Sequence, residues 1–274
     1  MLKFLLIVGL TLLGSCSSKK ADLKAKQANL YFSAGTQSLI DKDYTAALTS
    51  LMKANEFNPE STEILTNLGM AYYFKGEQEI AIKHLMQALK INPKNSDARV
   101  NLASIHYKDG KYAEAEKLYK EVLQDLTYDK QARTLYNLGL IELQSRKNSA
   151  GAEAYFKRSV KEDENYCPAF FQLGMVQYNR RQFNTALKNF KEAGTGTCYE
   201  SPAPHYYTGL TLVELGKLDS ARMKFDEVES RFKKTSYATK SRAKALELNS
   251  IEFRQQQKPQ GHASRNSVLE SPEF

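Results

Sequence analysis

The 274-residue sequence is poor in the residues from which reactive centres are built. It contains three cysteines and four histidines. The histidines have no metal-ligand spacing from one another or from the cysteines; they are His84, His106, His205 and His262. The sequence contains no phosphate-binding glycine loop. Nearly all of the 14 glycines fall at positions expected for close helix packing or for turns. We therefore expect a protein that is not an enzyme, with no metal, no other cofactor and no small-molecule substrate.

The apolar run at the N-terminus, Phe4–Leu13, is too short to span a bilayer. With Lys3 before it, it has the size and charge order of a secretory signal. It ends in Leu13-Gly14-Ser15-Cys16, which resembles the lipobox of bacterial lipoproteins. The resemblance implies that residues 1–15 are a signal peptide and that Cys16 is lipidated. Ser17 follows the cysteine, at the position where an aspartate is the usual signal for retention in the inner membrane. The resemblance therefore also favours the periplasmic face of the outer membrane. An ordinary signal peptide followed by a chance cysteine is the alternative.

The two ends of the mature chain lack apolar periodicity. Residues 16–27 are polar and lysine-rich and predict a flexible tether between lipid and fold. Residues 254–274 predict a disordered tail.

The formal charge of +8 is spread along the chain except in 231–244, which holds six basic residues and no acid. This run is typical of a solvated helix face, with contact to phosphate-bearing lipid as the alternative. We expect no nucleic-acid partner, because the chain is exported and has no binding motif for one.

Small residues that follow a leucine-like residue recur with spacings of 34, 34, 36, 35 and 35. They are Gly35, Gly69, Ala103, Gly139, Gly174 and Gly209. This period predicts an all-α, superhelical tetratricopeptide-repeat solenoid over residues 28–253. About six helical hairpins start near residues 28, 62, 96, 132, 167 and 202, and a capping helix covers 236–253. In the fourth repeat, Arg146-Lys147-Asn148 stands where a turn glycine belongs, which indicates a one-residue insertion.

In such repeats the first helices line the concave side, with positions two, five, nine and twelve on that face. Here the face is aromatic and apolar, which predicts a groove for an apolar protein segment, either an amphipathic helix or an extended peptide. The groove residues are Phe32, Met70, Tyr73, Tyr107, Tyr136, Leu140, Phe171, Met175, Tyr178 and Tyr206. The alternative is that several of these side chains pack against their own second helices.

Cys167 and Cys198 stand at the first and thirty-second positions of the fifth repeat. Antiparallel helices bring the two ends of a hairpin together, and an exported protein meets an oxidising compartment. A disulfide is therefore expected, with two unpaired buried thiols as the alternative.

The lipobox, the six repeats, an insertion near the third-to-fourth junction and a cysteine in the fifth repeat together resemble the PilF, PilW and Tgl group of type IV pilus lipoproteins. The segments Tyr136-Asn137-Leu138-Gly139-Leu140, Ala154-Tyr155-Phe156-Lys157-Arg158 and Ala169-Phe170-Phe171-Gln172-Leu173-Gly174 carry most of this likeness. It implies a pilotin, which binds a secretin subunit and supports its assembly in the outer membrane. The alternative is a lipoprotein adaptor that recruits cell-wall hydrolases or other envelope proteins.

Overall fold

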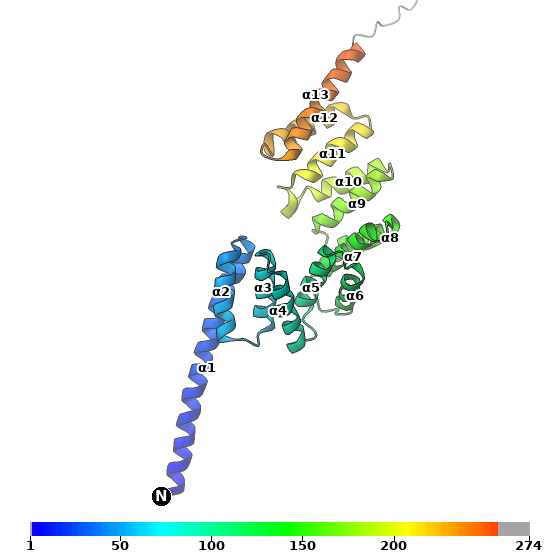
Figure 1. The fold of residues 1–274 in the computed structure, drawn as a ribbon. Coiled ribbons are helices and arrows are strands. Elements are labelled where there is room, and N and C mark those ends of the chain that lie inside the picture. The colour runs from blue at the N-terminus through cyan, green and yellow to red at the C-terminus, as the bar shows by residue number, and fades with distance from the viewer. Residues whose placement is uncertain (1, 257–274) are drawn as a thin grey trace, which may run out of the picture. The chain divides into compact units, whose positions relative to one another are not determined.

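The structure, a computed structural model, describes residues 2–256 and the side chains of residues 21–250. Every regular element in this part of the chain is a helix (Figure 1). The prediction of an all-α repeat fold is confirmed. The chain forms two compact units, with the division between Asp163 and Glu164, and each unit is described by itself.

Unit 1 is a stack of four antiparallel helical hairpins. They are α1 (Leu2–Ile40) with α2 (Tyr44–Phe57), α3 (Thr62–Phe74) with α4 (Gln78–Ile91), α5 (Ser96–Lys108) with α6 (Tyr112–Val122), and α7 (Gln131–Gln144) with α8 (Ser149–Glu162). Unit 2 holds two hairpins and a last helix. Its elements are α9 (Cys167–Asn179), α10 (Phe183–Ala193), the short 3-10 turn η1 (Gly196–Cys198), α11 (Pro202–Glu214), α12 (Leu218–Arg231) and α13 (Ser236–Gln256). From α3 onward, each first helix begins within one residue of a repeat start read from the sequence.

Local chemistry sets several of these helix starts. The side chains of Asp43, Ser61, Asn95 and Asn148 each accept a hydrogen bond from the backbone N–H three residues later. Such caps satisfy backbone donors that have no partner inside the helix. In unit 2, α9 and α11 instead have proline in their first turn, where a missing N–H costs nothing.

Each hairpin closes by packing a small residue of its first helix against a large residue of its second. A Cβ added at Gly174 would lie 2.6 Å from Phe190, and one added at Gly139 would lie 2.5 Å from Phe156. The same relation holds between Gly209 and Phe225. A second small residue, an alanine of the second helix, is fully buried in all six hairpins: Ala47, Ala81, Ala115, Ala152, Ala186 and Ala221. Close approach of the two helices therefore depends on the periodic small residues.

The turn between the two helices of each hairpin contains one residue with a positive φ. These residues are Lys42, Gly76, Gly110, Lys147, Arg181 and Gly216. Five of them stand at the fifteenth position of their repeat, counted from the starts given above. Lys147, with φ 51°, stands at the sixteenth, which agrees with a one-residue insertion in the fourth turn.

Buried side chains are shared between neighbouring hairpins. One cluster joins Leu65 of α3, Leu85 of α4 and Leu102 of α5. Another joins Phe225 of α12 with Ala245 and Leu248 of α13, so that α13 covers the last hairpin. Because no hairpin encloses a core alone, stacking supplies most of the apolar burial.

Two segments differ from the expected boundaries. Residues 16–27, for which a flexible tether was expected, lie within α1. Lysine and alanine are good helix formers, and the helix already present after residue 28 supplies the nucleus for its own extension. At the other end, α13 runs to Gln256, while residues 257–274 of the expected tail lie outside the described residues. Within residues 2–256, none of the helices has both the length and the apolar character needed to cross a membrane.

Candidate protein-binding groove

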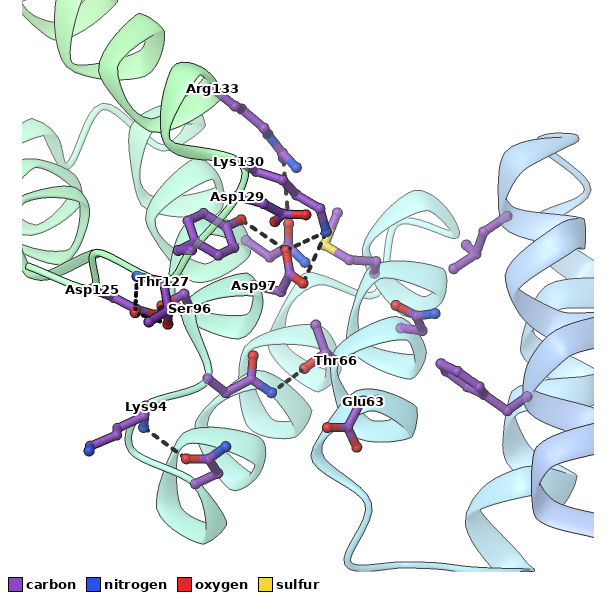
Figure 2. A pocket seen from close by; sticks show the side chains of 18 of the residues that line it. Glu63, Thr66, Lys94, Ser96, Asp97, Asp125, Thr127, Asp129, Lys130 and Arg133 are labelled. Atoms are coloured by element: carbon purple, nitrogen blue, oxygen red, sulfur yellow. Dashed lines mark hydrogen bonds and ion pairs between the residues drawn. The ribbon is translucent and has the colours of Figure 1, made fainter. Parts of the chain in front are cut away.

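A hollow of about 680 Å³ opens on unit 1, and we call it the unit 1 groove. Its walls come from α1, α3, α5, the start of α7, and the connections between α4 and α5 and between α6 and α7 (Figure 2). Phe32, Leu39, Met70 and Phe74 form its apolar part. Its polar part includes Asn67, Asn95, Asp97, Asn101, Lys130 and Arg133. The groove can therefore contact both apolar side chains and the polar backbone of a partner.

The connection 123–130 is held against α5 by side-chain hydrogen bonds. Asp125 accepts from Ser96 at 2.7 Å and from the hydroxyl of Thr127 at 2.6 Å, and these bonds lower the pKa of its carboxyl. Tyr128 donates to Asp97 at 2.9 Å. Burial, followed by the neighbouring Asp97 carboxylate, raises the pKa of this tyrosine.

Asp97 also forms an ion pair with Lys130, whose Nζ lies 3.1 Å from both carboxylate oxygens (Figure 2). Asp97 therefore binds the end of the connection to α5 through two side chains. The loop becomes a fixed part of the groove wall.

The structure places the predicted groove residues of unit 1 at half-buried positions. Phe32 and Met70 line the groove. Tyr73 packs edge-on against Phe74, with ring centroids 5.6 Å apart. Tyr107 contacts Tyr112 of its own second helix, and burial raises the pKa of its hydroxyl. Of the predicted groove residues in unit 1, Phe32 and Met70 are the two that line the unit 1 groove.

The remaining two predicted residues of unit 1 lie on α7. Tyr136 is tilted against Phe156 of the second helix at 5.8 Å, and Leu140 is half-buried. Tyr107 and Tyr136 thus follow the alternative in which a ring packs on its own hairpin, while part of each remains accessible.

In unit 2, Phe171, Met175 and Tyr178 are half-buried on α9. Phe171 and Tyr178 form an aromatic cluster with Phe190 and Tyr207. The hydroxyl of Tyr178 also donates to Glu214 at 3.5 Å.

Tyr206 does not lie on an open face, contrary to its assignment to the groove. It is only 9% exposed and packs against Phe225 and Tyr237. The closing helix α13 covers this ring. The ring therefore belongs to the core of the last hairpin and cannot offer its face to a partner.

The three cysteines have separate surroundings. Cys16 lies in α1, but its side chain is outside the described residues. Cys167 begins α9 and Cys198 ends η1; their Cα atoms are 6.2 Å apart and a disulfide joins them. Among the side chains that the structure describes, no group of three histidine, cysteine or acidic residues is arranged to hold a metal ion.

The polar groove residues were not anticipated from the sequence. Asn67 and Asn101 share the sixth position of the second and third repeats, 34 residues apart. That shared position is a signal in the sequence, but it lies outside positions two, five, nine and twelve, from which the concave face is predicted. The contributions of Lys130 and the 123–130 connection had no periodic signal, because they come from a segment between repeats.

Comparison with known proteins agrees with the repeat fold. The tetratricopeptide repeat family matches residues 96–165, and a second model, TPR repeat, matches residues 71–110. The type IV pilus assembly protein PilF of Pseudomonas aeruginosa is 28% identical over 193 residues, which cover 69% of this chain and 76% of that protein.

Two solved structures extend this match to three dimensions. The Pseudomonas aeruginosa PilF structure has a TM-score of 0.68 at 21% identity and covers 80% of this chain and 98% of its own. The structure of PilW, described as a widely conserved type IV pilus biogenesis factor, has a TM-score of 0.65 at 20% identity and covers 78% and 97%. The chain is similar to the PilF and PilW group. At these identities the structural matches establish the fold alone, a tetratricopeptide-repeat solenoid.

Proposed function

We propose that the chain is a pilotin, an outer-membrane lipoprotein that binds a secretin subunit and supports its assembly for type IV pili. The observation that carries the proposal is the match to PilF, which extends over 76% of that protein in sequence. A match of this length includes most of the repeats, whereas a match to repeat consensus alone would be short.

The N-terminal sequence supports a role at a membrane surface. In this proposal Leu13-Gly14-Ser15-Cys16 directs acylation of Cys16, and the acyl chains hold the protein at the periplasmic face of the outer membrane. Each buried methylene group contributes about 0.8 kcal/mol, so several acyl chains give stable anchoring. The repeats then lie close to the membrane into which a secretin must insert.

The unit 1 groove is the proposed secretin-binding surface. Before assembly, a secretin subunit exposes segments that later become buried between subunits. Phe32 and Met70 offer apolar contact for such a segment. Met70 is half-buried on α3 and its thioether can adapt to side chains of different shape.

The test measures secretin multimers on gels in cells that lack the chain and in cells that carry groove variants. Deletion should leave secretin as monomers and cells without pili. Met70→Ser should reduce the multimers while the purified variant keeps its helical circular dichroism. Normal multimers in the deletion strain would reject the pilotin proposal.

Met86→Ser is the matched control. Met86 lies on α4, is 58% exposed and is not part of the groove wall. The same substitution on a helix of the same unit should leave secretin multimers unchanged. Equal losses in the two variants would assign the effect to the general surface rather than to the groove.

A further inference from the structure

One side of α1 carries apolar side chains that remain exposed in unit 1. Leu23 is 58% exposed and Leu30 is 68% exposed. They are seven residues apart, as are Ala28 and Gly35, which are buried. Leu30 and Ala28 are two residues apart and so lie about 200° from each other around the helix. The two pairs therefore mark opposite sides of α1, and we call the side of Leu23 and Leu30 the outer side.

The outer side is also without charge over most of its length. Between Lys26 and Asp41, no residue is acidic or basic. Exposed Ala34 and Gln37 continue this side beyond Leu30. A surface helix ordinarily carries charged or polar side chains on the side that faces water. The composition of the outer side is therefore that of a contact surface.

The position of Cys16 indicates what covers this surface. Cys16 precedes Leu23 by seven residues and Leu30 by fourteen, and α1 is continuous through all three. Each step of seven residues departs from two full turns by about 20°, so the three positions fall within about 40° of one another. An acyl group attached at Cys16 is therefore on the same side of the helix as the two leucines.

Basic residues follow the lipid attachment site. The segment 17–26 contains four lysines and one acid: Lys19, Lys20, Lys24, Lys26 and Asp22. Asp22 pairs with Lys26 at 2.7 Å, but both side chains are exposed, so the pair stabilises little. Lysines beside a membrane attract anionic headgroups, and their methylene stems can lie along apolar surface while the ammonium groups stay in water.

The same lysines disfavour a second copy of the chain as the occupant. Two copies anchored in one membrane would run in the same direction, so contact through their outer sides would bring the two lysine clusters together. Like charges at close range repel. In the described part of unit 1, the N-terminal part of α1 continues past α2 without a neighbouring helix, which leaves it free to approach a lipid surface (Figure 1).

We propose that α1 of the mature chain lies flat on the membrane. Leu23 and Leu30 then sit at the boundary between headgroups and acyl chains, as the apolar side of an interfacial amphipathic helix does. Phe32, which lines the unit 1 groove, is about 200° around α1 from Leu30. The groove therefore stays accessible in this orientation. The inference rests on the proposed acylation of Cys16 and names the lipid-contacting surface of the anchored protein.

The test exploits the absence of tryptophan from the chain, because a single introduced indole then reports on one site. Leu23→Trp and Leu30→Trp are made separately in the full chain, purified in acylated form and reconstituted into phosphatidylglycerol vesicles. Bromine atoms on the lipid acyl chains quench an indole that reaches them. Both variants should therefore lose most of their emission in brominated vesicles compared with unbrominated ones. Circular dichroism should show unchanged helix content.

Met86→Trp is the matched control. Met86 lies on α4 of the second hairpin and is 58% exposed, close to the exposure of Leu23. Its indole should keep its emission in the same brominated vesicles. Uncharged phosphatidylcholine vesicles test the lysines, since quenching of Leu30→Trp should weaken when the headgroups carry no net charge. Equal quenching in the two lipids would refute the contribution of the lysines.

Three results would overturn the proposal. One is unquenched emission from Leu30→Trp at the long wavelengths of an indole in water, and another is a chain that does not float with the vesicles. The third is emission at short wavelengths without quenching, which would assign the outer side to a second copy of the chain. None of these is failure of the pilotin proposal, because normal secretin multimers in a deletion strain would leave the lipid contact unaffected.

Discussion

The size of a few side chains determines how closely the helices of each hairpin approach. Gly174 illustrates the relation, because the Phe190 ring occupies the space that a Cβ would need, with ring carbons at 2.6 Å. In the third hairpin, Ala103 occupies the equivalent position of the first helix, and the facing residue is Tyr119. Steric fit at this position therefore has to be tested hairpin by hairpin.

Gly174→Ala should lower the free energy of unfolding by about 1 to 2 kcal/mol, because overpacking outweighs the better helix propensity of alanine. Urea denaturation followed by circular dichroism measures the change. Phe190→Leu should relieve part of the clash, so the double variant should lose less than the sum of the two single losses. A stabilised Gly174→Ala variant would contradict the steric explanation.

His205 is a second residue whose surroundings affect a measurable property, the dependence of stability on pH. It is buried, its Nε2 lies 3.0 Å from the carbonyl oxygen of Tyr199, and its ring stacks on Phe232. Burial lowers its pKa below the ordinary value of 6.5, and burial also lowers the pKa of His84. The folded state therefore favours the neutral imidazoles.

The free energy of unfolding should fall as the pH decreases through 6.5, because His205 and His84 bind protons more readily in the unfolded chain than in the folded protein. Above that pH both states are neutral at these residues and the contribution is constant. Thermal unfolding at pH 7.5 and 5.5 should show a lower Tm at pH 5.5. His84→Gln with His205→Gln should reduce this difference. An unchanged wild-type Tm across the two pH values would count against the assignment.

At the scale of elements, the connections between helices are held by specific side-chain interactions. The segment between α10 and α11 is held by the Cys167–Cys198 disulfide and by Arg231, which donates to the carbonyl oxygen of Tyr199 at 2.7 Å. The guanidinium of Arg231 also lies over the Tyr199 ring at 3.4 Å. The segment is thus attached to both neighbouring hairpins of unit 2.

Replacing both Cys167 and Cys198 by Ser should lower the free energy of unfolding of unit 2 by about 3 to 4 kcal/mol, from the loop entropy of a closed loop of about 30 residues. Thermal unfolding with and without reductant measures the loss, and the double variant should not respond to reductant. Thiol titration of unfolded, unreduced protein exported to the periplasm provides the direct check. Two reactive thiols per chain would rule out the bond.

At the scale of the molecule, the basic character of the sequence is partly neutralised by folding. The 231–244 run has no acid of its own, yet Arg231 pairs with Glu200 at 3.0 Å and Arg242 with Glu229 at 2.6 Å. Lys244 pairs with Glu247 at 2.7 Å. Surface pairs such as Arg242–Glu229 and Lys244–Glu247 add little stability, but all three pairs reduce the charge that this segment, from the end of α12 to the start of α13, offers to a membrane or another acidic surface.

Cys16→Ala should abolish acylation and release the protein from the membrane fraction, because the thiol is the proposed acyl acceptor. Labelling with a fatty-acid analogue, followed by fractionation, measures both effects. Cys198→Ser should keep its label, which controls for general effects of losing a cysteine. Equal labelling of the Cys16→Ala variant and wild type would disprove this anchor.

The sequence by itself determined the repeat architecture of this protein. Helix packing requires a small residue once in each hairpin, so Gly35, Gly69 and their equivalents mark the repeats directly. The inserted residue at Arg146-Lys147-Asn148 was also readable, because the positive φ of Lys147 falls one place later than in the other turns. Both features are local to one hairpin, which is why periodicity in the chain was sufficient.

Only the tertiary structure decided which side chains form the groove. Periodicity identifies the face of a helix, but it does not say what lies opposite that face. Tyr206 has the correct spacing, yet α13 covers it. The contact between Lys130 and Asp97 joins residues 33 apart, and that between Asn67 and Thr36 joins residues 31 apart. Such contacts depend on how hairpins stack and where the 123–130 connection folds, and stacking is a property of the assembled repeats.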